Sequence, residues 1–356
     1  MNTGRFLAAW RRILTGSPPM LSIEITRECP LRCPGCYAYE DQHLGGGVTL
    51  RQLADLRGDA LVDGVLNLVK RHRPVHVSLV GGEPLVRHRE LSRILPALSA
   101  GRVETLVVTS GVIRVPADWD NLEYVRIAIS VDGLPADHNA RRFPATYDRI
   151  LANIAGRRVD ISWVITGPQM KQPGYLDEYL AFWTKRPEVD RIWTSIYTPQ
   201  VGENSPQMLT PDERRRLVAR LPALKSQYPA LLMTGGIAEA LASPPASPDE
   251  CVFSRMSVNY SADLKTQVQP CFFGGQPDCR QCGCAVTAGL HWIGSKKVLG
   301  PIRLSHVMEA SIAVGAIVSR RNRSRMQGGS ERRRNRISAA LKITAPAPNL
   351  QVRGRS

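Results

Sequence analysis

Short apolar runs alternate with amphipathic stretches from residue 21 to about residue 227. The runs predict buried strands, and the stretches, in which apolar residues recur every three or four positions, predict helices. The predicted strands are Leu21–Thr26, His76–Val80, Thr105–Thr109, Tyr124–Val131, Asp160–Thr166 and Arg191–Thr198. The predicted helices are Thr49–His72, Arg89–Ser99, Tyr147–Gly156, Tyr175–Thr184 and one capped by Thr210. Strands that alternate with helices pair in parallel, so the predicted fold class is α/β.

The segments around this repeat differ from it in composition. Residues 1–20 contain an amphipathic helix at Thr3–Thr15, which we expect to flank the folded core; its Trp and Arg residues also permit weak attachment to a membrane surface. The chain is therefore divided into the N-terminal helix, a core over 21–242, a cysteine-rich module over 243–300, an apolar helix over 301–318 and a basic tail over 319–356.

The net charge of +16 is concentrated in the tail. Residues 319–356 hold eleven Lys or Arg and one acid, so the rest of the 356-residue chain carries only a modest positive charge. The tail lacks apolar periodicity and is rich in Arg, Ser, Gly and Pro, a composition typical of disorder. It has no aromatic residues to stack on bases, so we expect a solvated tail and no nucleic-acid partner, with RNA or anionic lipid as alternatives.

No apolar run reaches the length of about 20 residues that spans a bilayer. The apolar stretch Phe6–Leu14 is interrupted by Arg11 and Arg12 and is not a signal peptide. Eight cysteines in a chain without an export signal indicate metal ligation rather than disulfides. We therefore expect a cytoplasmic protein without a transmembrane segment.

Three of the cysteines lie close together directly after the first predicted strand. Cys29, Cys33 and Cys36 are separated by three and two residues, and the Pro and Gly residues among them favour a tight loop. Iron–sulfur clusters are normally held by four thiolates, so a local trio indicates a cluster with one open iron. A zinc knuckle is the alternative, but zinc requires four ligands and no fourth Cys or His is nearby.

This trio, together with Gly81-Gly82-Glu83-Pro84 after the second strand, resembles the radical S-adenosylmethionine (SAM) superfamily. The resemblance implies a 4Fe-4S cluster on Cys29, Cys33 and Cys36, with SAM bound to the open iron. It also implies a partial (β/α)6 TIM-like barrel and a one-electron donor such as flavodoxin or ferredoxin. Many members carry an aromatic residue before the third cysteine, where this chain has Gly35.

The Gly-Gly-Glu-Pro motif has a physical reason at a strand end. Without side chains, Gly81 and Gly82 let the backbone come close to the methionyl group of SAM, and Glu83 can accept from its ammonium group. The alternative is an ordinary turn between a strand and a helix. Barrels of this type place their chemistry at the C-terminal ends of the strands, where this motif and the cysteine trio fall.

The sequence Ser130-Val-Asp132-Gly is similar to a motif of the family branch that modifies peptides and proteins. By that resemblance, Ser130 and Arg142 hold the SAM carboxylate, Asp132 faces the substrate as a catalytic residue, and Ser110 lies near the ribose. Arg141 competes with Arg142 for its role. The alternative is that Asp132 caps a helix and both arginines lie on the surface.

A second cysteine set lies towards the C-terminus, at Cys251, Cys271, Cys279, Cys282 and Cys284. It resembles the SPASM/twitch-like modules that bind auxiliary clusters, without matching their full seven-cysteine version. Four of these thiolates suffice for a second 4Fe-4S cluster. Zinc is the alternative, since four thiolates also suit zinc, and a site without metal is a third possibility.

These observations favour a radical SAM enzyme. Peptide or protein modification is the first hypothesis for its substrate. The second is modification of a lipid of the hopanoid or isoprenoid type, because related enzymes also carry C-terminal cysteines. The third is a non-catalytic iron–sulfur or RNA-interacting protein that uses the basic tail.

Overall fold

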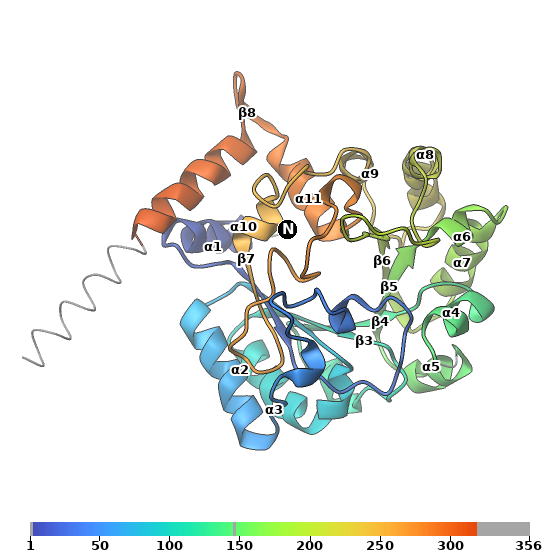
Figure 1. Ribbon diagram of the computed structural model, residues 1–356, viewed down its shortest axis with the longest axis horizontal. Coiled ribbons are helices and arrows are strands. Elements are labelled where there is room, and N and C mark those ends of the chain that lie inside the picture. Colours follow the sequence, from blue (N-terminus) through green and yellow to red (C-terminus); the bar gives the residue numbers. More distant parts are fainter. Residues whose placement is uncertain (1–2, 145–146, 319–356) are drawn as a thin grey trace, which may run out of the picture.

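Seven parallel strands form a curved, open sheet at the centre of the molecule (Figure 1). The computed structural model describes residues 3–144 and 147–318. The strands are β1 (Met20–Glu24), β2 (His76–Val80), β3 (Glu104–Thr109), β4 (Val125–Ser130), β5 (Val159–Ile165), β6 (Val189–Ile196) and β7 (Ser257–Tyr260). Their order is β6-β5-β4-β3-β2-β1-β7, so β6 and β7 are the edges and the barrel is not closed.

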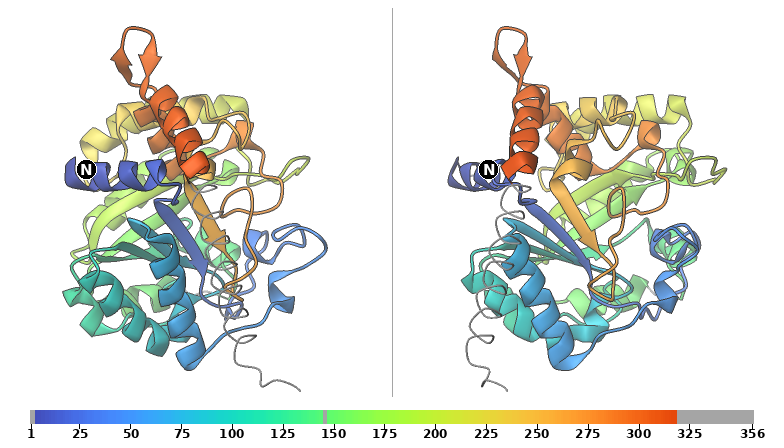
Figure 2. Two further views of the ribbon diagram at one scale, coloured as in Figure 1. Left: turned by 90° about the vertical axis from the view of Figure 1, so that its left-hand side faces the viewer. Right: turned by 60° about the vertical axis from the view of Figure 1, so that its left-hand side comes forward.

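Helices surround the outer side of this sheet (Figures 1 and 2). They are α1 (Thr3–Leu14), α2 (Gly58–His72), α3 (His88–Ala100), α4 (Pro135–Arg141), α5 (Tyr147–Ile154), α6 (Gly167–Met170), α7 (Tyr175–Thr184), α8 (Pro211–Gln227), α9 (Gly235–Ala242), α10 (Val252–Met256) and α11 (Ala285–Gly294). A hairpin of β8 (Lys297–Leu299) and β9 (Ile302–Arg303) leads into a further helix over 304–318. Short 3-10 turns are η1 (Tyr37–Tyr39), η2 (Leu50–Gln52), η3 (Pro84–Arg87), η4 (Ala117–Asn121) and η5 (Cys279–Gln281).

The six strands predicted from the sequence are confirmed, with ends within about two residues. Each carries apolar side chains into the main core; in β2 and β3 every second residue is buried. The predicted cap of α8 is confirmed, since Thr210 Oγ1 accepts from Glu213 N and Glu213 accepts from Thr210 N. This reciprocal pair satisfies two backbone donors at the helix start.

One local prediction is wrong, and one strand is missing from the prediction. The helix expected from Thr49 begins at Gly58, and Thr49 instead precedes the short turn η2, whose Gln52 side chain accepts from Thr49 N. The sheet also has a seventh strand, β7, which lies in the segment predicted as the cysteine-rich module and pairs with β1. Its four residues, Ser-Val-Asn-Tyr, are too few and too polar to show a strand pattern.

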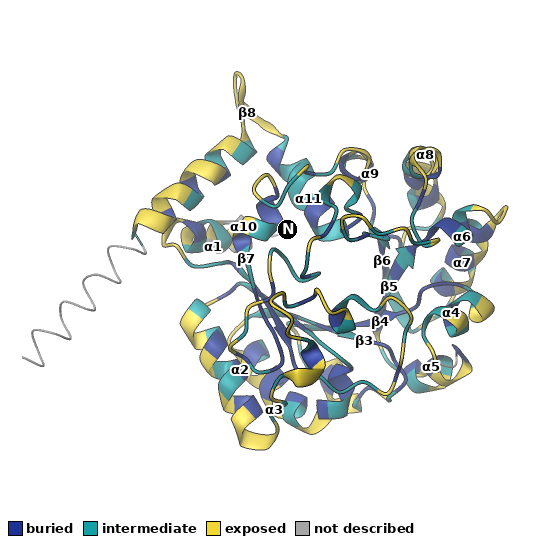
Figure 3. Ribbon diagram, in the orientation of Figure 1, coloured by how far each residue is buried: buried dark blue, intermediate teal, exposed yellow. Residues whose placement is uncertain are grey.

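A second, smaller core joins the two ends of the described chain. Ile13 of α1 packs with Val252, Met256 and Met308, and Trp10 lies against this cluster. A helix occupies 304–318, within the segment 301–318 predicted as an apolar helix, whereas the tail lies outside the described residues. Exposed residues gather on the outer faces of the helices and on the hairpin (Figure 3). Among the described helices, none is both long and apolar enough to span a bilayer.

Candidate functional site

The loop over 25–36, here called the cysteine loop, follows β1 and is joined to the turn after β2. Gly82 N donates to Thr26 O at 2.8 Å, and Glu83 N donates to Glu28 O at 2.8 Å. A Cβ atom on Gly82 would lie 2.2 Å from Glu28 O, and Gly81 has a φ of 120°. Both positions therefore require glycine to keep the turn against the cysteine loop. Their contact with the methionyl group of SAM remains a prediction.

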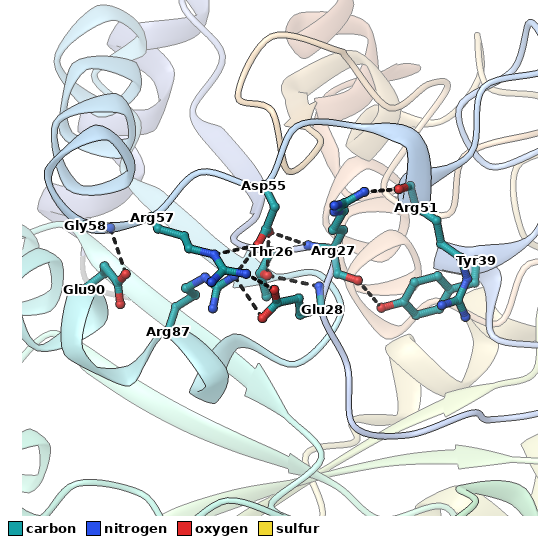
Figure 4. A network of polar contacts seen from close by, with 10 residues as sticks. All are labelled: Thr26, Arg27, Glu28, Tyr39, Arg51, Asp55, Arg57, Gly58, Arg87 and Glu90. Atoms are coloured by element: carbon teal, nitrogen blue, oxygen red, sulfur yellow. Dashed lines mark hydrogen bonds and ion pairs between the residues drawn. The ribbon is translucent and has the colours of Figure 1, made fainter.

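A network of charged side chains holds the other side of the cysteine loop (Figure 4). Asp55 accepts from Thr26 Oγ1 at 2.7 Å and from Arg27 N at 3.1 Å, and it pairs with Arg87. Arg87 also lies 3.0 Å from Glu28. Burial raises the pKa of Asp55, but these hydrogen bonds and the Arg87 charge outweigh burial and hold that pKa below its usual value. The ionised Asp55 thus fixes the chain immediately before Cys29.

The three thiols of the cysteine loop are partly buried, and burial raises the pKa of each. The pKa of Cys29 rises to about 11, mainly through burial and further through Glu83, Cys33 and Cys36. Arg142 lowers the pKa of Cys33 and Cys36 without outweighing burial. Such thiols stay protonated at neutral pH until a bound cation displaces the proton.

The donor set of the cysteine loop fits an iron–sulfur cluster. The three thiols influence one another's pKa, so they share one neighbourhood on a single loop. Within residues 3–144 and 147–318, no three Cys, His, Asp or Glu side chains are arranged as a ready ligand set.

Glu83 is fully buried, and its carboxylate accepts hydrogen bonds from residues at the end of β3. Oε1 accepts from Leu85 N at 2.9 Å and from Thr109 Oγ1 at 2.6 Å. Oε2 accepts from the backbone N of Ser110 at 2.8 Å and from its hydroxyl. Glu83 thus ties the turn after β2 to Ser110. The predicted contacts of Glu83 with the SAM ammonium and of Ser110 with the ribose remain predictions.

Asp132 lies just beyond β4 and is 2% exposed. Its Oδ2 accepts from Nε of Arg141 at 3.1 Å and from Nε of Arg142 at 2.9 Å, and its Oδ1 accepts from Val164 N at 3.3 Å. Burial raises the pKa of Asp132, but the two guanidinium charges outweigh it and hold that pKa below its usual value. Asp132 is therefore an ionised anchor for both candidate arginines.

The segment that contains Arg141 and Arg142 also contacts the cysteine loop. Arg32 N donates to Phe143 O at 2.5 Å, next to Arg142. Arg141 is turned toward Gln207, to which its Nη1 donates at 3.0 Å. The charge of Arg142 therefore acts more strongly on Cys33 than that of Arg141 does. Ser130, the last residue of β4, is buried.

All five cysteines of the C-terminal set line one cavity. Cys251 and Cys284 are buried and the other three are partly buried. The cavity wall contains Cys251, Cys271, Cys279, Cys282, Cys284, Phe253, Phe272, Phe273 and Thr287. Convergence of five thiols on one apolar cavity fits a single metal centre, although these side chains too are not drawn together as ligands in the part of the chain that the structure describes.

The chain that carries these cysteines covers the C-terminal end of the edge strand β6. The backbone hydrogen bonds that join them run from Ile196 N to Gly283 O at 2.9 Å, from Val201 N to Gln276 O at 2.8 Å and from Asp278 N to Pro199 O at 2.8 Å. The cysteine segment thus pairs with backbone groups that an open sheet would leave exposed at this edge.

A buried ion pair joins the two cysteine regions. His43 Nε2 lies 2.7 Å from Glu24 Oε1, and His43 Nδ1 lies 2.9 Å from Phe273 O, two residues after Cys271. The Ser261 hydroxyl donates to the other oxygen of Glu24. Tyr37, next to Cys36, packs edge-on against Phe273 with ring centroids 5.5 Å apart. No pattern in the sequence singles out Glu24 or His43, because their partners lie far away along the chain.

Comparison with known proteins gives a family match for residues 23–166. Residues 23–166 match the family model described as the Radical SAM superfamily. Pre-heme d1 synthase of Dinoroseobacter shibae is 29% identical over 165 residues, which cover 44% of this chain and 39% of that protein. PqqA peptide cyclase of Rhizobium meliloti is 28% identical over 155 residues, which cover 42% of this chain and 39% of that protein. The chain thus aligns with about two fifths of each relative.

Solved structures extend the similarity in fold. SuiB of Streptococcus suis bound to the precursor peptide SuiA matches with a TM-score of 0.53 at 15% identity, covering 76% of this chain and 63% of SuiB. SuiB bound to S-adenosylmethionine matches with a TM-score of 0.50 at 16% identity, covering 72% and 60%. The family model ends at residue 166, so the resemblance of the C-terminal cysteines to auxiliary-cluster modules remains a prediction.

Proposed function

We propose that this chain is a radical SAM enzyme that modifies a peptide, a proposal supported by the match of residues 23–166 to the family model of the Radical SAM superfamily. The observation that carries the proposal is the cysteine loop, which is joined to the Gly81–Pro84 turn on one side and to the Arg142 segment on the other. Cys29, Cys33 and Cys36 would hold a 4Fe-4S cluster with one open iron.

A cluster held there would supply the electron for reductive cleavage of the sulfonium of SAM to methionine and a 5′-deoxyadenosyl radical. The residues of the chain would bind SAM and orient it. Arg142, held by Asp132 beside the cysteine loop, would bind the SAM carboxylate, a charge-assisted contact of defined geometry. Because the Asp132 carboxylate faces the two arginines, we assign it to positioning them. Ser130 would contact the same carboxylate from the end of β4.

The C-terminal cysteines would hold a second metal centre. Five thiols on one cavity exceed the four that a 4Fe-4S cluster needs, and we favour such a cluster over zinc. Free thiols at both sites need a reducing compartment, and SAM cleavage needs a one-electron donor, so we assign the enzyme to the cytoplasm with a flavodoxin-like or ferredoxin-like partner.

The peptide substrate is supported by the similar proteins. PqqA peptide cyclase is named for a peptide, and SuiB was solved with its precursor peptide. Pre-heme d1 synthase is not named for a peptide, so the substrate test should include small molecules as well. A lipid substrate remains the alternative from the sequence.

Iron content and EPR spectra of the anaerobic protein test the proposal. The wild type is compared with the triple variant Cys29→Ala, Cys33→Ala, Cys36→Ala, and 5′-deoxyadenosine is measured after addition of reductant. The wild type should form 5′-deoxyadenosine, and the variant should not. If the variant keeps roughly four irons, as one cubane requires, the C-terminal set holds a cluster; if only zinc remains, that set is a zinc site. A wild type that never binds iron would show that the proposal is wrong.

A further inference from the structure

The β8–β9 hairpin projects from the body of the molecule (Figures 1 and 2). Residues 296–303 are all exposed, as Figure 3 shows for this region. Val298 is 57% exposed, Leu299 75% and Ile302 43%. Exposed aliphatic side chains that gather on one projecting hairpin, rather than being scattered singly, mark a candidate site of interaction.

Packing within the protein does not account for this hairpin. Two antiparallel strands alone are marginally stable in water, and stability normally needs a third strand or a packed apolar face. Here the three apolar side chains bury little area against the rest of the described chain. Their placement at a projecting tip therefore suits contact with something outside the chain.

The charges beside the tip are all positive. Lys296, Lys297 and Arg303 flank the apolar residues, and no acid occurs from residue 279 to residue 308. Lys296 Nζ lies 4.4 Å from the ring centroid of Trp292, so this cation lies at the base of the hairpin. An apolar tip flanked by three cations complements a membrane surface that carries anionic headgroups over an apolar interior.

A second exposed apolar group lies where α1 meets the helix over 304–318. A Cβ atom on Gly315 would lie 2.0 Å from Ile13 O, so glycine allows the two elements to touch. Close to this contact, Leu14 is 39% exposed and Val314 is 48% exposed. The tail that follows this helix contributes eleven Lys or Arg and one acid.

We propose that the β8–β9 hairpin docks the protein on the surface of an anionic lipid bilayer. The tip side chains would enter the boundary between headgroups and acyl chains, and the flanking cations would contact anionic headgroups. The exposed residues are aliphatic, which suits lipid and disfavours single-stranded nucleic acid, whose bases stack on aromatic rings. The proposal concerns where the protein binds and is independent of its substrate.

Sedimentation with vesicles tests this proposal on the full chain. Vesicles of phosphatidylcholine with phosphatidylglycerol are compared with vesicles of phosphatidylcholine alone. The wild type should bind the anionic vesicles, and Leu299→Glu should weaken binding by at least about tenfold, since burial of one leucine is worth about that factor. Val201→Glu is the matched control, because Val201 is 64% exposed in the loop after β6; it should bind as the wild type does.

Further variants separate the hairpin from the tail and from misfolding. Replacing Lys296, Lys297 and Arg303 with Gln should weaken binding and reduce its dependence on salt. A chain that ends at residue 318 should still require Leu299 for binding. The melting temperature of each variant should match that of the wild type, because the replaced side chains are exposed. The proposal is wrong if the wild type does not bind anionic vesicles, binds neutral ones equally well, or binds vesicles or RNA without any effect of Leu299→Glu.

Discussion

Replacing His43 with alanine tests the buried ion pair that joins the two cysteine regions. Glu24 is 4% exposed and His43 is 1% exposed, so within the described residues the variant leaves a buried carboxylate whose remaining side-chain partner is the Ser261 hydroxyl. Removing one member of a buried pair costs about 3–5 kcal/mol. This is a large share of the ~5–15 kcal/mol by which folded proteins are usually stable. We expect His43→Ala to lower the free energy of unfolding by several kcal/mol.

Urea denaturation of the metal-free, reduced protein, followed by circular dichroism, measures this change. The matched control is Arg215→Ala, which removes an exposed pair with Asp212 whose two side chains are each 74% exposed. Exposed pairs contribute about 0–1 kcal/mol. A loss in His43→Ala no larger than in Arg215→Ala would refute the reasoning.

The pH dependence of stability gives an independent check on His43. Burial lowers the pKa of His43, but the hydrogen bond and charge of Glu24 outweigh burial and raise that pKa. A raised pKa in the folded state stabilises the protein fully below the unfolded value of about 6.5 and loses this effect as pH rises through the folded value. Above about pH 6.5 the wild type should therefore lose stability more steeply than His43→Ala. Equal slopes would contradict the assignment.

Two further predictions concern the core of the site. Gly82→Ala should reduce the iron bound by the reconstituted protein, because its Cβ would meet Glu28 O at 2.2 Å; Gly289→Ala in α11, where a Cβ meets no atom within 4 Å, should bind iron normally. His138 is buried, and burial and the Arg142 charge lower its pKa to about 4. The unfolded chain binds this proton at about pH 6.5, so the melting temperature should fall between about pH 6.5 and 4. The fall should be smaller in His138→Gln, and an identical fall would contradict the burial argument.

The strands could be predicted from the sequence because their pattern is local. His76–Val80 matches β2 residue for residue, since its apolar positions alternate and glycines follow it. β7 lacks any such pattern and is a strand only because β1 offers it a partner. The sequence predicts too early a start for α2, because Thr49 can cap any helical turn and here precedes the short turn η2.

The candidate site was only partly accessible to prediction, for a physical reason. The cysteine spacing and the Gly-Gly-Glu-Pro motif each span only a few residues, so their positions could be predicted. The partners of Glu83 include Thr109 and Ser110 at the end of the next strand, and those of His43 include Phe273 in the C-terminal module. Such contacts depend on the three-dimensional path of the chain. For the same reason the sequence could not show that Asp132 binds both Arg141 and Arg142.

The position of β1 in the sheet has a consequence for biosynthesis. β1 is an interior strand between β2 and β7, and Glu24 at its end accepts a hydrogen bond from the Ser261 hydroxyl. Ribosomes add about 5–20 residues per second, so the roughly 220 residues between Cys36 and Tyr260 emerge over about 10–45 s. During that interval a nascent chain has its cysteine loop but lacks β7 and the hydrogen bond from Ser261 to Glu24, which support β1. Insertion of iron should therefore follow release of the full chain, and fragments that stop before Ser257 should expose β1 as an unpaired edge prone to aggregate.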